Sequence, residues 1–447
     1  MCRDASEGEY AIHEAGVTYL PKLHDELAED YEKRKNMTPF FNATWRTIAG
    51  LRGMLFRKPP VIEYQTAFEQ FVLNIDNAGT PLVRFANDVA EEALEVGRIG
   101  LLVDYPPVDN IGSLADAQAM GLRGLITSYE AEDILNWRTA RINGVTVLTM
   151  VVLKEDAAIA GVDEFDHKCE DRYRVLDLFN GVYRQRVFRI NDKDEDEQVG
   201  EDIFPIMNGK TMNFIPFIFI GTDCLEPDID APPLIDLVTT NIHHYQISTS
   251  YERGCFISGL GTMFVYGYVP DDASPIYMGG AKANCIQNTD ARAEFVELKS
   301  EFNALRTNLL DKKQEMALLG ARMLESQKSG IESAEAIARR QNGDESILSD
   351  MSQTISMGIT IALRWLAMWQ GIEGDIKFEM NRDFMPSRLS AQELTALFAA
   401  LQGGGISHQT YFDNLKAGEI IDSDVTFEDE QARINSAAPQ LPIAATS

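Results

Sequence analysis

The sequence predicts an α+β chain that is mainly helical, with a β-rich stretch between two helical regions. Two observations predict this class. Apolar residues recur every three or four positions before residue 60 and again after residue 300, which is the period of a helix. Between about 98 and 220 the period shifts towards two, in segments rich in β-branched and aromatic residues. The chain has 447 residues, 45% of them hydrophobic, which is enough for a buried core and for two or three domains.

The first helical region covers residues 18 to 58 and ends at Pro59 and Pro60, because proline has no amide hydrogen to donate. A second helix is expected over about 80 to 97. Strands are expected after it, with a hairpin turn at "NGVY" in the fourth of them. Their sequences are "RIGLLVDYPP", "ILNWRTARI", "VTVLTMVVLKE", "RYRVLDLFNGVYRQRVFRI" and "FIPFIFIG".

Two further helices, over 231–258 and 299–323, bracket a Gly-rich insert with short strand-like segments at 259–298. The pattern predicts a helix, a small β-rich cap and a returning helix. Both helices have narrow apolar stripes. The first stripe is Leu234, Val238, Ile242, Tyr245 and Phe256, and the second is Phe302, Leu305, Leu309, Met316, Leu319 and Met323.

Residues 324–331 interrupt the helical pattern, which resumes at Ser333 and persists to about residue 370. At 1.5 Å per residue, a continuous helix over 332–370 has a length of about 55 Å. We expect Gly343 and Gly358 to kink it. Helices of this length are typical of coiled coils, repeats or assemblies, because one small core does not cover them.

The charge balance is acidic, with 40 Lys and Arg against 69 Asp and Glu and a formal net charge of -29. This argues against a protein that reads nucleic-acid sequence, since such proteins present a basic face to the phosphates. It is compatible with a surface that DNA passes without sticking. The five cysteines are scattered without a CxxC spacing, which favours a reducing intracellular setting. We expect no signal peptide and no membrane span.

Two adjacent histidines, His243 and His244, are the clearest candidates for metal chemistry. Neighbouring residues on a helix point about 100° apart, so both are not expected to face one ion. A metal-dependent hydrolase that uses either histidine with Asp236 stays open as the least favoured alternative. The sequence has no dinucleotide fingerprint, P-loop, GxSxG or HExxH motif. We therefore predict no catalytic residue, no metal and no cofactor.

The order of these segments resembles the portal proteins of tailed bacteriophages, the head-to-tail connectors. The resemblance covers about residues 18 to 430, and no single motif within it is diagnostic. The quoted segments that carry it are "NATWRTIAGLRGMLFRKPPVI", "ALEVGRIGLLVDY", "IPFIFIG" followed by "PPLIDLVTTNIHHYQISTSYERG", "EFNALRTNLLDKKQEMALLGARM", "ESQKSGIESAEAI" and "SAQELTALFAALQGGGISHQTYFDNLKAGEIIDSD".

The resemblance implies a division of the chain into seven parts. These are a wing (1–230), a first stem helix (231–258), a clip (259–298), a second stem helix (299–323), a tunnel loop (324–331), a long wing helix with a return strand (332–385), and a crown with the C-terminal tail (386–447).

The resemblance also implies a function. Portal proteins form rings of twelve copies at one capsid vertex, within the major capsid protein shell and its scaffold, and are made in the host cytoplasm. The ring docks the terminase large subunit during genome packaging, later binds head-completion and tail adaptor proteins, and lets double-stranded DNA pass independently of sequence. It hydrolyses nothing itself. Another structural virion component, such as a scaffold or capsid-associated protein, stays open as an alternative.

An acidic channel repels phosphate, so a few residues at the constriction are expected to steady the DNA backbone. The tunnel loop supplies Gln327, Lys328 and Ser329, and the second stem helix supplies Lys312 and Lys313. For the three lysines, an ordinary solvated position is an equally good interpretation.

Overall fold

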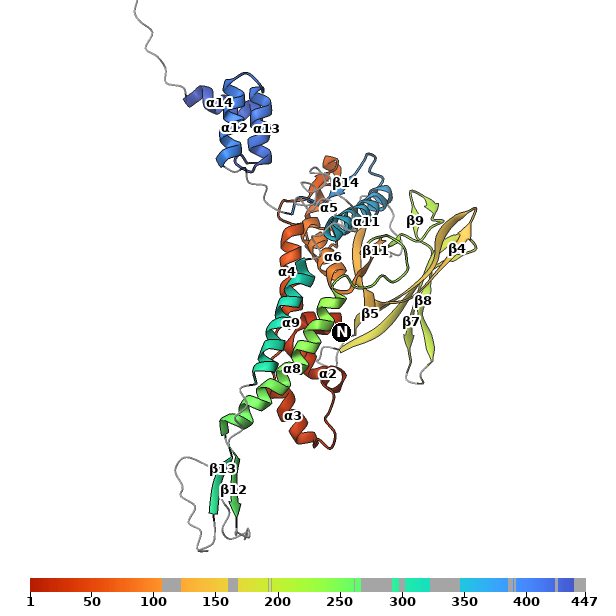
Figure 1. The fold of residues 1–447 in the computed structure, drawn as a ribbon. Coiled ribbons are helices and arrows are strands. Elements are labelled where there is room, and N and C mark those ends of the chain that lie inside the picture. The colour runs from red at the N-terminus through yellow and green to blue at the C-terminus, as the bar shows by residue number, and fades with distance from the viewer. Residues whose placement is uncertain are drawn as a thin grey trace, which may run out of the picture.

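The computed structural model describes residues 1–106, 122–159, 168–191, 193, 195–260, 262–266, 292–296, 302–321, 346–384, 389, 391–422 and 425–437. Its mixture of helices and antiparallel sheets confirms the α+β class. Figure 1 shows helices α8 and α9 side by side in a column with the N-terminal helices, and the large sheet to one side of it. Within the described residues, no helix combines the length and the apolar character needed to cross a membrane.

The N-terminal region consists of α1 (Cys2–Glu7), α2 (Glu9–Ala15), η1 (Gly16–Thr18), α3 (Ala28–Met37) and α4 (Ala43–Leu55). The single helical pattern expected over 18 to 58 is therefore divided. Thr38 precedes Pro39 and has an extended backbone, because the proline ring disfavours a helical residue before it. Asn42 then caps α4 by accepting a hydrogen bond from the Trp45 amide.

The elements that follow lead into the sheets. They are β1 (Val61–Glu63), η2 (Thr66–Phe68), α5 (Glu69–Leu73) and α6 (Leu82–Val96). The helix α6 confirms the prediction for 80 to 97, and it ends at Gly97, whose left-handed backbone (φ 80°) suits a residue without a side chain.

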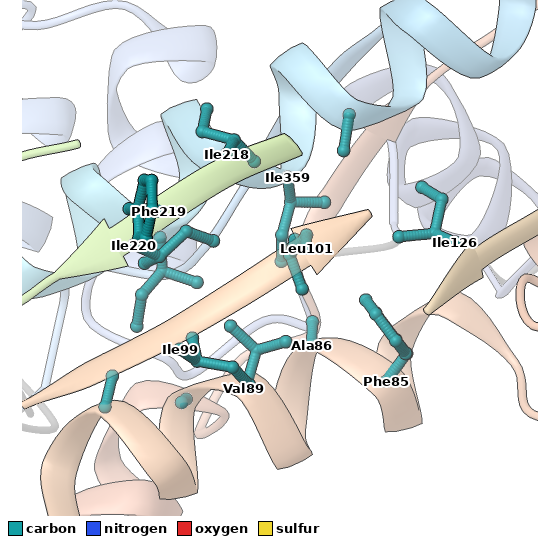
Figure 2. Close-up of a cluster of buried hydrophobic side chains, with 14 of the residues drawn as sticks. Phe85, Ala86, Val89, Ile99, Leu101, Ile126, Ile218, Phe219, Ile220 and Ile359 are labelled. Carbon is teal, nitrogen blue, oxygen red and sulfur yellow. The ribbon is translucent and has the colours of Figure 1, made fainter. Parts of the chain in front are cut away.

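A three-stranded antiparallel sheet has the order β11-β2-β3, with β2 at Arg98–Asp104, β3 at Leu125–Glu130 and β11 at Phe217–Gly221. Figure 2 shows α6 on one side of it, contributing Phe85, Ala86 and Val89, and Ile359 on the other side. Ile359 belongs to α11 (Ile347–Gln370), and its side chain is buried. Burial on both faces explains why β2 and β11 read as continuous apolar runs.

The large sheet has five antiparallel strands in sequence order, as a meander. They are β4 (Ile134–Ile142), β5 (Val145–Ile159), β6 (Lys168–Phe179), β7 (Val182–Ile190) and β8 (Asp196–Ile203), with η3 (Ala131–Asp133) before them and the short pair β9 (Ile206–Met207) and β10 (Lys210–Thr211) after them. The "NGVY" turn is confirmed. Asn180 and Gly181 have φ values of 52° and 80°, as a two-residue hairpin turn requires.

The central helices are α8 (Ile235–Leu260) and α9 (Asn303–Ala321), which pack against each other. Between them in the chain, β12 (Thr262–Tyr266) pairs antiparallel with β13 (Arg292–Val296). The α8 stripe is confirmed for its first four residues, which are buried, and is wrong for Phe256, which is 52% exposed. On α9, Met316 is buried and the other described stripe residues are partly covered, while Met323 lies outside the described residues.

A continuous helix from 332 to 370 is wrong, because α11 begins only at Ile347. Ser346 has an extended backbone (φ -87°, ψ 161°), and its hydroxyl accepts a hydrogen bond from the Ser349 amide. Because Ser346 is the non-helical N-cap of α11, a continuous helix does not pass through it. Residues 322–345, which include Gly343, lie outside the described residues. The remaining α11 is about 36 Å long.

Gly358 serves packing in α11. A Cβ atom at Gly358 would lie 2.6 Å from two side-chain carbons of Ile220, so the absent side chain lets the helix approach β11 closely. Helix α11 also covers one edge of β14 (Lys377–Glu379), whose other edge pairs with β1. The Thr360 hydroxyl bonds both the Phe378 amide and carbonyl, and the Ser356 hydroxyl accepts from the Met380 amide.

Three helices, α12 (Ala391–Gln402), α13 (His408–Ala417) and α14 (Phe427–Ala437), end the described chain. Figure 1 shows them as a small group at the end of the molecule opposite β12 and β13. Arg57, just after α4, reaches this group through an ion pair with Glu419.

Candidate functional site

The pair α8 and α9 is the candidate functional site, and its two helices are covered very differently. Helix α8 contacts α1, α3, α4 and α9, and these neighbours bury most of its circumference. Among its described side chains, five exposed polar residues lie along one side of the helix: Asp236, Thr239, His243, Ser250 and Arg253. Helix α9 buries only Met316 among its 19 residues.

Asn241 fixes α8 to the start of α4. Its side chain is fully buried, and its Oδ1 accepts hydrogen bonds from the amides of Ala43 (3.1 Å) and Thr44 (3.2 Å). Its Nδ2 donates to the Phe41 carbonyl at 3.0 Å. The first amides of a helix have no partner within the helix, so α4 receives its cap from a residue about 200 positions away in the sequence. The sequence alone gives no signal for this contact.

The two histidines lie in opposite environments. His243 is exposed, whereas His244 is 4% exposed and its ring lies 5.7 Å from that of Phe41. Both ring nitrogens of His244 lack a hydrogen-bond partner among the described residues. Burial, with a smaller contribution from the positive charge of Lys313, lowers the pKa of His244 to about 4. The imidazole is therefore neutral at neutral pH.

This arrangement does not bring His243 and His244 to a common ion. Asp236, the proposed partner in a hydrolase, is exposed on the same line as His243, but it lies about 10 Å away along the helix axis. The two histidines therefore point in different directions, as expected for neighbouring residues on a helix.

The two α9 lysines have different surroundings. Lys312 forms an ion pair with Glu315 at 2.7 Å on the same helix. Lys313 Nζ lies 4.6 Å from the centre of the Phe41 ring, and the Arg46 guanidinium lies 5.3 Å from it. The three loop candidates, Gln327, Lys328 and Ser329, lie outside the described residues. The structure therefore places Lys313 and Arg46 around the same Phe41 ring. The sequence did not predict this group, because α4 and α9 are far apart in the chain.

A carboxylate cluster lies outside this helix pair. Ligand atoms of Glu92, Glu130 and Glu132 lie within 4.8 Å of one another, a spacing that suits a cation. Arg3 supplies that cation, with its guanidinium 2.6 Å from Glu92 and 2.7 Å from Glu132. It also lies 3.7 Å from Glu95. The cluster therefore attaches helix α1 to α6, which explains how a six-residue helix is held in place.

Glu95 should make stability pH-dependent. Burial raises the pKa of Glu95 to about 7 from 4.5, against the opposing effect of Arg3. The folded state then holds a proton between these values that the unfolded state releases, so the contribution of Glu95 to stability falls as pH rises from about 4.5 to 7. Glu95→Gln should remove this decline and be about 1 kcal/mol more stable than wild type at pH 8.

Urea denaturation of Glu95→Gln at pH 5 and pH 8 measures this effect. The matched variant Glu14→Gln, on an exposed position of α2, reports what removing one surface carboxylate does by itself. A Glu95→Gln protein that loses as much stability as wild type between the two pH values would contradict the expectation.

A groove of about 620 Å³ runs between α11 and β14. Arg364 at the rim of the groove forms an ion pair with Asp375, and Arg382 forms one with Glu379. Both arginines are therefore paired with carboxylates of the same chain. Its floor is mainly apolar, with Met357, Ile361 and other side chains of α11. Nothing in this groove supplies a nucleophile with an adjacent base, and it offers no catalytic arrangement among the described residues.

Residues 233–370 match a family described as a domain of unknown function, DUF4055. The chain is similar to one in a structure of the neck of an empty gene transfer agent (GTA) particle computed with C6 symmetry, at 12% identity and a TM-score of 0.40, covering 82% of this chain and 88% of the other. It is also similar to a chain of the virion of a native GTA particle, at 12% identity and a TM-score of 0.38, covering 82% and 88%.

A third similar chain comes from the neck of a native GTA particle computed with C12 symmetry. It is 12% identical, with a TM-score of 0.40, and the match covers 83% of this chain and 89% of the other. None of the curated proteins matches the chain.

Proposed function

We propose that this chain is a portal protein, a ring-forming structural component at one vertex of a phage-like capsid. The observation that carries the proposal is the exposure of α9. It is 19 residues long, it buries Met316 alone, and its apolar side chains Leu310 and Leu318 are 57% and 59% exposed. Large apolar side chains in such a helix favour cover from another molecule. The order of elements around it, from an α+β region through a helix, a strand pair and a returning helix, fits the resemblance described above.

In this proposal the ring has twelve copies and hydrolyses nothing itself. It docks the terminase large subunit during genome packaging and head-completion and tail adaptor proteins afterwards, and it contacts the major capsid protein and scaffold. Double-stranded DNA passes through the channel during packaging and ejection without being read. A net charge of -29 supports free passage, because carboxylates repel phosphate. Gln327, Lys328 and Ser329 of the tunnel loop, with Lys312 and Lys313, are proposed to contact the DNA backbone.

The hydrolase alternative receives no support from the described residues, since His244 is buried in its neutral form and Asp236 is remote from it. The scaffold alternative differs from a portal in the symmetry of its assemblies, which is a measurable property.

The proposal predicts a closed ring. Native mass spectrometry of the purified protein at micromolar concentration should give one dominant species near twelve times the 49.9 kDa chain mass, and negative-stain images should show end-on rings with an axial hole. Dilution into denaturant, with the loss of the same species, is the control for nonspecific clustering. A folded protein that stays monomeric at these concentrations would rule the proposal out, and two-fold dimers or open filaments would favour the scaffold alternative.

A further inference from the structure

Helix α9 presents three distinct surfaces. One is the stripe against α8, centred on the buried Met316. Opposite it lies a line of exposed residues without charge at spacings of three and four: Asn303, Thr307, Leu310, Gln314, Ala317 and Ala321. Between these two surfaces lie the two flanks of the helix, and both carry charge.

The flanks have opposite signs. Arg306 and Lys313 are seven positions apart and therefore lie on the same side, which we call the basic flank together with Arg46 of α4. Asp311 and Glu315 lie two positions before and after Lys313, so each points about 160° away from it around the helix. These two carboxylates form the acidic flank.

Both flanks are open to other molecules. The side chains of the five flank residues are all exposed: Arg46, Arg306, Asp311, Lys313 and Glu315. Within the part of the chain that the structure describes, Arg306 and Asp311 form no ion pair, and Glu315 is half exposed although it pairs with Lys312. Lys313 contacts the Phe41 ring, a contact that leaves its ammonium accessible.

The positions of these charges along the helix axis match between two parallel copies of α9. At 1.5 Å per residue, Lys313 lies about 3 Å above Asp311 and about 3 Å below Glu315 along the axis. If a second copy lies alongside in the same direction, its Lys313 meets the midpoint between the two carboxylates. A two-fold dimer through either flank would instead place each flank against itself, so that like charges meet. The charge pattern thus favours a head-to-tail contact, which closes into a ring.

We propose that the acidic flank of α9, Asp311 and Glu315, binds the basic flank of a second copy of this chain, Arg306 and Lys313 with Arg46. This inference rests on the proposed ring and names its contact surface. Because the contact is exposed, it sets direction and partner choice, and salt weakens it.

Charge reversal tests the contact. The variant Arg306→Glu/Lys313→Glu has two acidic flanks, and Asp311→Lys/Glu315→Lys has two basic flanks. Each alone should place like charges at every subunit contact and raise the concentration for half-assembly at least about tenfold, measured by sedimentation in low salt. An equimolar mixture of the two should assemble again, because every contact of an alternating ring then joins opposite charges. The fourfold swap should assemble by itself.

The control reverses an exposed ion pair elsewhere, Arg84→Glu with Asp88→Lys on α6, and should leave assembly at the wild-type level. Circular dichroism should give wild-type helix content for every variant, since all the changed side chains are exposed. Folded reversal variants that each form rings at the wild-type concentration would overturn this contact and leave the ring proposal standing. So would a mixture that stays unassembled while wild type forms rings. A wild type without rings contradicts both proposals.

Discussion

Replacing Asn241 with leucine should lower the free energy of unfolding by about 4 kcal/mol. Leucine fills a similar volume but accepts no hydrogen bond, so the amide and the hydroxyl of Thr44 lose the Oδ1 acceptor inside the protein. The Ala43 amide and the Phe41 carbonyl also lose Asn241, but they keep their hydrogen bond to each other at 2.7 Å. Each buried group without a partner costs about 1 to 3 kcal/mol, and the cost is high here because Asn241 is fully buried.

Urea denaturation followed by circular dichroism at one protein concentration measures this loss. Asn42→Ala is the matched comparison, because Asn42 caps the same helix from a less buried position through the Trp45 amide. It should cost about 1 kcal/mol. If Asn241→Leu were no more costly than Asn42→Ala, the long-range cap would not contribute as described.

The wild-type protein should lose about 2 kcal/mol of stability through His244 alone between pH 7 and pH 4.5. The pKa of His244 is lowered to about 4, whereas an unfolded histidine titrates near 6.5. Between these values the unfolded state binds a proton that the folded state excludes, so stability falls as pH falls through this window. His244→Leu should remove this contribution, and at pH 7 it should be at least as stable, since it deletes two buried nitrogens without partners.

Thermal or urea unfolding of both proteins at pH 7, 5.5 and 4.5 should show a stability difference that increasingly favours His244→Leu over wild type as the pH falls. His243→Gln is the control, because it changes the exposed neighbour and should keep the acid sensitivity of wild type. A His244→Leu protein with the wild-type pH dependence would show that the buried imidazole does not titrate as expected.

Local patterns were sufficient for much of the fold. The strands β2, β4, β5, β6 and β7 and the turn at Asn180 and Gly181 follow from apolar patterns and turn chemistry within a few residues, whereas no pattern predicted β3. Helices α8 and α9 follow from their apolar stripes. Where local pattern failed, a single residue at the boundary of an element decided the outcome. Thr38 before Pro39 divides the first helical region, and the Ser346 cap starts α11.

The candidate site was less predictable, because its geometry comes from contacts across the chain. That one of two adjacent histidines is buried depends on Phe41, some 200 positions earlier. The attachment of α1 depends on Arg3 meeting Glu92 and Glu132, and neither spacing has a sequence signature. The opposite flanks of α9 are visible in the sequence, but their exposure depends on which neighbours cover the helix.

The hydroxyl contacts between α11 and β14 limit how another protein can attach there. A free strand edge invites an extended peptide to join the sheet through main-chain hydrogen bonds. Here Thr360 and Ser356 already bond the main-chain groups of Phe378 and Met380, and β1 pairs with the other edge. An additional strand therefore has no free edge of β14 to pair with. A molecule that binds this face has to recognise the side chains of the adjoining groove, such as Met357 and Ile361.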